Sequence, residues 1–163
     1  MSQNSPRLLA LGTALPPHRI TQAQVLGILA QAKGKALPSR MAEILGNTGI
    51  EQRHIAMRPE YYFRERSWAD RAKVYEDAAS RMFQAAANQA LARAGLTPAD
   101  IGQSVFVSTT GTMTPSLPSR MIAAMGFAPN TRCVPLFGYG CAGGVIGLGV
   151  AADLYRALPE KPV

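Results

Sequence analysis

The stretch RCVPLFGYGCAGGVIGLGVAADLYRAL, residues 132–158, carries the strongest indications of the fold. It begins with a short apolar run at 132–137 that is typical of a strand. A glycine-rich turn follows, and the apolar spacing of 142–158 predicts a long helix. The segment is therefore expected to form a strand, a turn and a helix in succession, with Cys141 close to the beginning of the helix.

The remainder of the chain shows the same alternation of strands and helices. The clearest helix is predicted at 68–94, where apolar residues recur at three- and four-residue intervals until Gly95. The other expected elements are strands at 7–14 and 104–109, a rigid proline loop at 15–18, helices after the N-cap Thr21 and at 39–45 and 116–125, and an irregular loop at 58–66. This alternation favours an α/β fold in which helices cover a parallel or mixed sheet, because parallel strands need crossover helices.

The composition indicates a globular domain. Of the 163 residues, 47% are hydrophobic and 17% are charged, which is enough apolar material for a core. The sequence has no apolar run of the roughly 18 residues that a membrane span needs and no apolar secretory signal, so a cytoplasmic protein is expected. Two cysteines and two histidines offer no zinc-ligand spacing, and no structural metal is expected.

The net charge of +7 raises the question of nucleic-acid binding. No recognised nucleic-acid motif accompanies the charge, and the nearby aromatic residues are not spaced as a stacking platform. The densest basic region also contains acidic residues, as on a solvated helix face: Arg64, Arg66, Arg71 and Lys73 alternate with Glu65, Asp70, Glu76 and Asp77. We therefore expect no nucleic-acid partner, while a basic rim for small substrates that carry phosphate stays open.

The glycine-rich turn allows two functional interpretations. The glycines at 138, 140 and 143 match the dinucleotide fingerprint G-x-G-x-x-G, but the acidic residue expected about 20 residues later is represented only by Glu160 in a turn. Alternatively, Cys141 is a nucleophile whose thiolate is stabilised by the helix N-terminus, and the glycines let a substrate carbonyl approach backbone N–H donors. A buried structural cysteine is the plainer alternative, and Cys133, inside the apolar strand, fits it.

Several motifs resemble those of bacterial type III polyketide synthases of the chalcone synthase family, in the thiolase superfamily. They are PLF at 135–137 with GCAGG at 140–144, STTG at 108–111, TPSL at 114–117, NTGIEQRH at 47–54 and GTALPP at 12–17. The last two are also similar to segments of ketoacyl carrier-protein synthase III enzymes. The resemblance implies a thiolase-like layered fold with residues 1–163 as the N-terminal domain, and a C-terminal domain is expected beyond the turn at 159–163.

The resemblance also implies a reaction. Cys141 would take an acyl group from a coenzyme A thioester, and decarboxylated malonyl units would extend it by Claisen condensation before cyclisation. Acyl-CoA and malonyl-CoA would be substrates, with no further cofactor, and the protein would be a homodimer. Thr109 and Thr110 would line the reaction cavity, and Thr114 would reach across the dimer interface, where plant enzymes carry methionine; Met113 lies one position earlier.

The resemblance is incomplete at two sets of functional residues. Of the three basic positions that bind coenzyme A phosphates in plant relatives, only Arg40 is basic here, and Glu43 and Asn47 occupy the other two. The catalytic histidine and asparagine of the family belong to its C-terminal half. His18 and His54 are expected in a solvated turn and at the surface, respectively, and nothing places either beside Cys141.

Two alternatives accompany the polyketide synthase interpretation. One is a ketoacyl carrier-protein synthase III homologue, which would use the same cysteine on a carrier-protein substrate. The other is a noncatalytic module that serves only for binding or dimerisation. Within the polyketide synthase interpretation, residues 68–95 lean toward fatty acyl starters that give alkylpyrones or alkylresorcinols.

Overall fold

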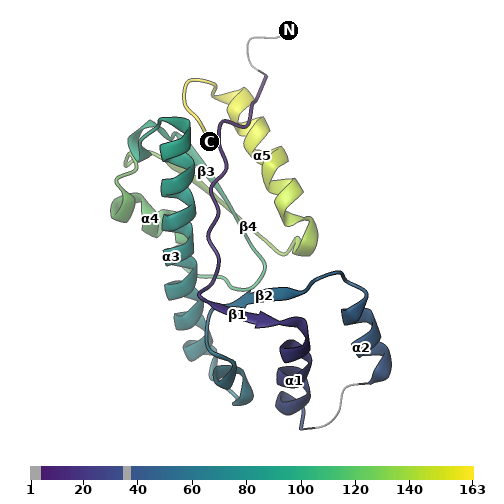
Figure 1. Cartoon of the computed structure of the whole chain (residues 1–163). Helices are drawn as coiled ribbons and strands as arrows, with labels where there is room; N and C mark the ends of the chain where they lie inside the picture. Colours follow the sequence, from purple (N-terminus) through teal and green to yellow (C-terminus); the bar gives the residue numbers. More distant parts are fainter. Residues whose placement is uncertain (1–4, 35–37) are drawn as a thin grey trace. The chain divides into compact units, whose positions relative to one another are not determined.

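The computed structural model describes residues 5–34 and 38–163. The chain divides into two compact units, whose elements are labelled in Figure 1. The cysteine-bearing unit consists of the segment up to Ala14 together with Tyr75–Val163, and the small unit consists of Leu15–Val74.

The small unit is built on two short antiparallel strands. Strand β1 (His18–Thr21) pairs with β2 (Gln52–Ile55), and the helices α1 (Gln22–Ala32) and α2 (Ser39–Gly46) lie between them in the chain. A 3-10 helix, η1 (Pro59–Phe63), follows β2 and contacts α1.

Thr21 is the N-cap of α1, as the sequence predicted. Its hydroxyl accepts a hydrogen bond from the Gln24 N–H at 3.2 Å, and Gln24 Oε1 accepts one from the Thr21 N–H at 2.7 Å. The two bonds form a capping box, which satisfies donors that a helix start leaves unpaired. Thr21 is therefore both the last residue of β1 and the N-cap of α1.

Two sequence-based expectations for the small unit are wrong, and one strand was not anticipated. His18 begins a strand instead of ending a proline loop, 52–55 form a second strand, and η1 gives regular structure to part of 58–66. Each strand has four residues, and β2 reads QRHI, so neither has the alternation of apolar and polar residues that identifies a strand. Their pairing across a long stretch of chain creates the strands.

Helix α3 (Trp68–Ala94) has the bounds predicted from its periodicity. At its start, the Ser67 hydroxyl and N–H donate to Asp70 Oδ2 at 2.7 Å and 3.3 Å, which lowers the pKa of the Asp70 carboxyl. Gly95 ends the helix with a φ of +67°, a conformation that glycine adopts without steric cost. Residues next to each end of α3 therefore determine where the helix begins and ends.

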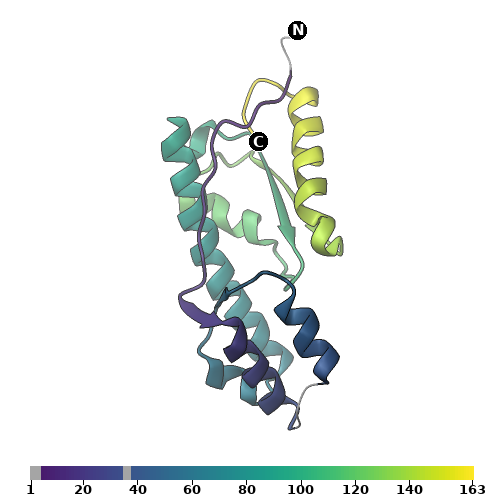
Figure 2. The same ribbon diagram turned by 45° about the vertical axis from the view of Figure 1, so that its right-hand side comes forward.

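The cysteine-bearing unit contains a parallel pair of strands between helices. Strands β3 (Gln103–Ser108) and β4 (Arg132–Phe137) are joined through the crossover helix α4 (Leu117–Met125), and α5 (Gly143–Ala157) follows β4. In Figures 1 and 2, α5 lies on one side of the strands, while α4 and the adjoining part of α3 lie on the other. This is the predicted arrangement of strands covered by helices.

The side chains between these layers form the core of the cysteine-bearing unit. Leu117 and Met121 of α4 are 1% and 7% exposed. Phe83 of α3 packs edge-on against Phe106 of β3, with ring centroids 6.0 Å apart. The core thus joins the crossover helix and the long helix to one face of the parallel strands.

Residues 7–14 are not a strand, contrary to the sequence-based expectation. The segment runs along α3 (Figures 1 and 2), where the Thr13 N–H donates to Gln89 Oε1 at 2.8 Å and Arg93 Nη1 donates to the Leu11 carbonyl at 2.6 Å. A Cβ on Gly12 would lie 1.9 Å from the Ala86 carbonyl oxygen, so only glycine permits this approach. A strand also needs a paired backbone neighbour, and here the backbone bonds to helix side chains instead.

The other face of β3 is held against α5 by two glycines. A Cβ on Gly143 would lie 2.6 Å from Val107 Cγ1, and a Cβ on Gly147 would lie 2.6 Å from Val107 Cγ2. Both glycines are buried. The α5 backbone can therefore approach β3 closely because these two positions carry no side chain.

We expect Gly147→Ala to lower the free energy of unfolding by about 1–3 kcal/mol, because the added methyl group overpacks Val107. The matched control is Gly149→Ala in the same helix, where a Cβ meets nothing within 4 Å. This variant should raise stability by up to about 1 kcal/mol through its higher helix propensity. Urea unfolding followed by circular dichroism measures both, and equal effects of the two variants would contradict the close packing.

Candidate active site

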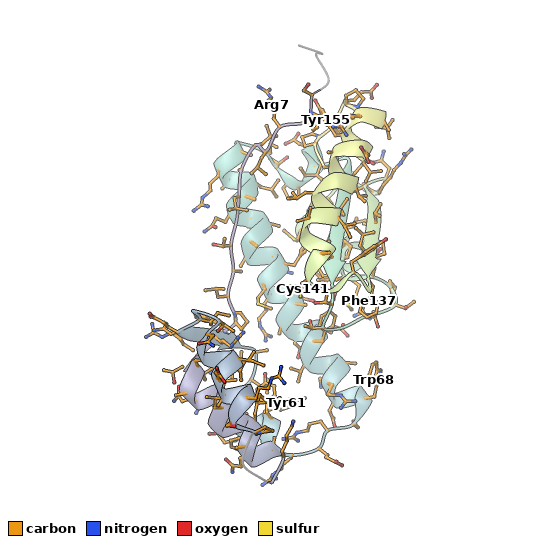
Figure 3. All side chains as sticks on the ribbon, turned by 90° about the vertical axis from the view of Figure 1, so that its right-hand side faces the viewer. Arg7, Tyr61, Trp68, Phe137, Cys141 and Tyr155 are labelled. Atoms are coloured by element: carbon orange, nitrogen blue, oxygen red, sulfur yellow. The ribbon has the colours of Figure 1, made fainter. Side chains whose placement is uncertain are left out.

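Cys141 lies in a tight turn between β4 and α5. Gly138 and Gly140 have φ angles of +92° and +53°, which side chains other than glycine rarely adopt. The residues from Gly140 to Ala142 form the 3-10 helix η3, and α5 begins at Gly143. Figure 3 shows the labelled Cys141 beside the first turn of α5. The turn therefore reverses the chain within a few residues and places the cysteine immediately before a long helix.

The Cys141 thiol is accessible, whereas Cys133 is half-buried in β4. Both cysteines are free, and Cys133 Sγ lies 4.0 Å from the Thr131 carbonyl oxygen. Cys141 therefore lies just before a helix, where the sequence predicted it, and its role as a nucleophile stays a prediction. The half-buried position of Cys133 is typical of a structural cysteine.

Two N–H groups of the turn are already used within it. The Ala142 N–H donates to the Tyr139 carbonyl at 3.2 Å, and the Gly143 N–H donates to the Gly140 carbonyl. These bonds stabilise η3 and fix the direction in which α5 leaves the turn. A backbone donor for an oxyanion at Cys141 therefore has to come from another N–H group of this region.

Thr109 and Thr110 emerge at the same edge of the parallel strands as the cysteine turn. The last residue pair of the ladder joins Ser108 of β3 to Phe137 of β4, and the carboxyl ends of parallel strands share one edge. Thr109 and Thr110 follow Ser108 directly and both are exposed. The structure therefore brings two of the predicted cavity residues to the strand edge that carries Cys141.

Tyr75 of α3 holds the beginning of the loop after β3. Its hydroxyl lies 2.7 Å from Ser108 Oγ, and Ser108 Oγ donates to the Gly111 carbonyl at 2.5 Å. A Cβ on Gly111 would lie 2.5 Å from ring atoms of Tyr75, so this glycine lets the loop lie against the ring. Sequence reasoning missed Tyr75, because one tyrosine on a long amphipathic helix does not differ visibly from its neighbours.

The remaining predicted residues are not part of this cluster. Thr114 is exposed in the loop that precedes α4, and Met113 beside it is half-buried. Arg40 is exposed on α2 of the small unit. The structure thus places Thr114 and Arg40 at accessible positions without contacts that assign them a role.

The histidines both belong to the small unit. His54 is exposed, as predicted, and its Nδ1 lies 2.9 Å from the Pro16 carbonyl oxygen. His18 is half-buried at the start of β1.

Among residues 5–34 and 38–163, no group of three or more His, Cys, Asp or Glu side chains is arranged to hold a metal ion. Over the same residues, no helix is long and apolar enough to cross a membrane.

Comparison with known proteins identifies the family. Residues 1–159 match the family model for the N-terminal domain of chalcone and stilbene synthases. The chain therefore belongs to the chalcone and stilbene synthase family, which confirms the resemblance stated on its motifs.

The relatives include bacterial enzymes of this family. A 1,3,6,8-tetrahydroxynaphthalene synthase of Streptomyces griseus is 36% identical over 152 residues, covering 92% of this chain and 41% of the relative. A phloroglucinol synthase of Pseudomonas fluorescens is 33% identical over 86% of this chain and 41% of the relative. The chain thus spans less than half the length of these relatives.

A solved structure confirms the fold. The crystal structure of 1,3,6,8-tetrahydroxynaphthalene synthase from Streptomyces coelicolor A3(2), a bacterial type III polyketide synthase, matches with a TM-score of 0.82 at 32% identity. The match covers 93% of this chain and 45% of that one. The chain accordingly has the predicted thiolase-like α/β fold of the corresponding part of such an enzyme.

We expect iodoacetamide to alkylate Cys141 at least about tenfold faster than Cys133 near neutral pH, because Cys141 is accessible at a helix start. Peptide mapping by mass spectrometry at short reaction times measures the two rates. In urea the rates should converge, which makes the unfolded chain the internal control. Equal rates in the folded chain would contradict the placement of the two thiols.

Proposed function

We propose that the whole protein is a type III polyketide synthase and that this chain supplies its nucleophile, Cys141. The observation that carries the proposal is the accessible thiol in a glycine turn at the start of α5. The family match and the similarity to bacterial tetrahydroxynaphthalene and phloroglucinol synthases support the reaction class. The family match and these relatives favour a type III polyketide synthase over a ketoacyl carrier-protein synthase III homologue and over a noncatalytic module.

In the proposed reaction, the Cys141 thiolate attacks the carbonyl carbon of an acyl-CoA thioester. A bond forms between that carbon and Sγ, and the coenzyme A thiolate leaves and takes up a proton. Malonyl-CoA then loses carbon dioxide, and the resulting enolate carbon attacks the acyl carbon on Cys141. The new carbon–carbon bond releases the cysteine thiolate and leaves a ketoacyl-CoA, which is extended again or cyclised.

The other predicted site residues receive roles that follow the family resemblance. Thr109 and Thr110 are proposed to line the cavity into which the acyl chain extends, which their exposure at the strand edge supports. Thr114 is proposed to lie at a homodimer interface, because its loop is exposed. Arg40 is proposed to bind a coenzyme A phosphate, since a guanidinium on an accessible helix suits an anion.

The substrates and setting belong to the same proposal. Acyl-CoA and malonyl-CoA are the proposed substrates, no separate cofactor is invoked, and the cytoplasm is the proposed location. The finer proposal is a fatty acyl starter that gives an alkylpyrone or alkylresorcinol. Product analysis with malonyl-CoA in the presence and absence of a long-chain acyl-CoA tests it, and a product formed equally without the starter would refute it.

We expect Cys141→Ala in the whole protein to reduce malonyl-dependent product formation by at least about a thousandfold, because the acyl group loses its attachment point. Cys133→Ala is the matched control and should stay within about threefold of the unchanged protein. Liquid chromatography with mass detection measures the product. Retained turnover in the Cys141 variant, with loss in the Cys133 variant, would overturn the proposal.

We expect the 163-residue chain by itself to form no polyketide product. Decarboxylation of malonyl-CoA requires donors for the developing enolate, and the family resemblance assigns the catalytic histidine and asparagine to the part of the relatives that this chain does not cover. Val145 and Leu148 of α5 are 76% and 67% exposed, which supports a role for a further protein surface there. The test compares the chain alone with the chain mixed with the remainder of the protein, and turnover by the chain alone would refute this expectation.

A further inference from the structure

The small unit contains a polar pocket that the proposed reaction does not use. Its volume is about 560 Å³, within the range of small-molecule sites. The polar and aromatic residues that line it come from the start of β1 and from the segment around η1: His18, Arg58, Glu60, Tyr61, Arg64 and Arg66. Arg40 does not line it, so the pocket is distinct from the position that family resemblance assigns to coenzyme A.

The pocket concentrates positive charge. The lining contains three arginines and one carboxylate residue, Glu60, so it keeps an excess of positive charge. Glu65 lies between Arg64 and Arg66 in the chain but does not line the pocket. The charges alternate in the sequence, which suggested a solvated helix face. In the fold, Arg64 and Arg66 line the pocket and Glu65 does not.

Two of these guanidinium groups are not engaged in ion pairs among the described residues. Arg58 and Arg64 are exposed, and the ion pairs found among the described residues involve neither. Guanidinium groups bind phosphate oxygens through paired N–H donors, which gives them an advantage over lysine at such sites. The pocket thus combines guanidinium donors outside any ion pair with a local excess of positive charge.

The third guanidinium is held in place by an aromatic ring. The Arg66 guanidinium carbon lies 4.7 Å from the centre of the Tyr61 ring, and Figure 3 labels Tyr61 in this part of the small unit. Arg66 Nε and Tyr61 Oη are both buried and have no hydrogen-bond partner among the described residues. Buried donors without an acceptor are costly, so a small shift of this stacked pair toward the pocket would let a bound anion accept their hydrogen bonds.

We propose that this pocket binds the phosphate group of a small molecule, with Arg58, Arg64 and Arg66 as its ligands and Tyr61 as a further donor. This phosphate group is either the 3′-phosphate of a coenzyme A thioester or the phosphate of a separate small phosphate ester. Phosphate binding itself does not depend on the proposed synthase activity, and only the coenzyme A source connects the two.

Titration of the 163-residue chain with inorganic phosphate, followed by calorimetry or amide chemical shifts, tests the proposal. We expect Arg58→Ala combined with Arg64→Ala to weaken phosphate binding at least about tenfold, and Tyr61→Phe to weaken it about threefold to tenfold. Tyr61→Phe keeps the ring under Arg66, so its fold is preserved. The control is Arg19→Ala, which removes an exposed charge from the same unit outside the pocket and should stay within about twofold.

A comparison of the affinities of coenzyme A and 3′-dephospho-coenzyme A distinguishes the two sources of the phosphate. If the pocket takes the 3′-phosphate, coenzyme A binds more tightly, and the difference disappears in the double arginine variant. If it takes free phosphate esters, the two coenzymes bind alike and inorganic phosphate still depends on Arg58 and Arg64. Phosphate binding that is absent, or unchanged in both the double arginine variant and Tyr61→Phe, would overturn the proposal.

Discussion

The contact of Gly143 and Gly147 with Val107 determines how the cysteine is presented. Because neither glycine has a side chain, α5 lies close to β3. The first turn of α5 therefore lies near the end of β4. Only a short turn then fits between strand and helix, and the positive φ angles of Gly138 and Gly140 provide it. The position of Cys141 at the strand edge is thus a consequence of helix packing.

The same edge receives the loop after β3. The parallel register ends at Ser108 and Phe137, so the segments that leave both strands begin side by side. Tyr75 then ties Ser108 and Gly111 to α3, which limits the directions that Thr109 and Thr110 can take. The candidate active site is therefore assembled from three features: the parallel pairing of β3 and β4, the close packing of α5 on β3, and the contact of Tyr75 with Ser108.

Local signals account for what could be predicted from the sequence. The bounds of α3 and β4, the N-cap Thr21 and the turn at Cys141 all depend on nearby residues, and each is found where expected. Features that depend on distant partners were missed. Segment 7–14 has the composition of a strand but bonds to α3, and β1 and β2 form because they pair with each other.

The basic residues around η1 illustrate the same limit. In the sequence their charges alternate with acids, and only the folded backbone separates Arg64 and Arg66 from Glu65. The contribution of Tyr75 to the loop after β3 likewise depends on a partner 33 residues away in the chain. Sequence patterns therefore predicted the position of Cys141 in its turn but not the residues that surround that turn.

We propose that Cys141 is the residue that carries the acyl group. The most direct measurement is tandem mass spectrometry of the whole protein, digested after brief incubation with an acyl-CoA and quenched in acid. We expect the mass of the acyl group on the peptide that contains Cys141 and no such addition on the peptide that contains Cys133. An acyl group found on Cys133, or on any other residue while Cys141 stays free, would contradict it.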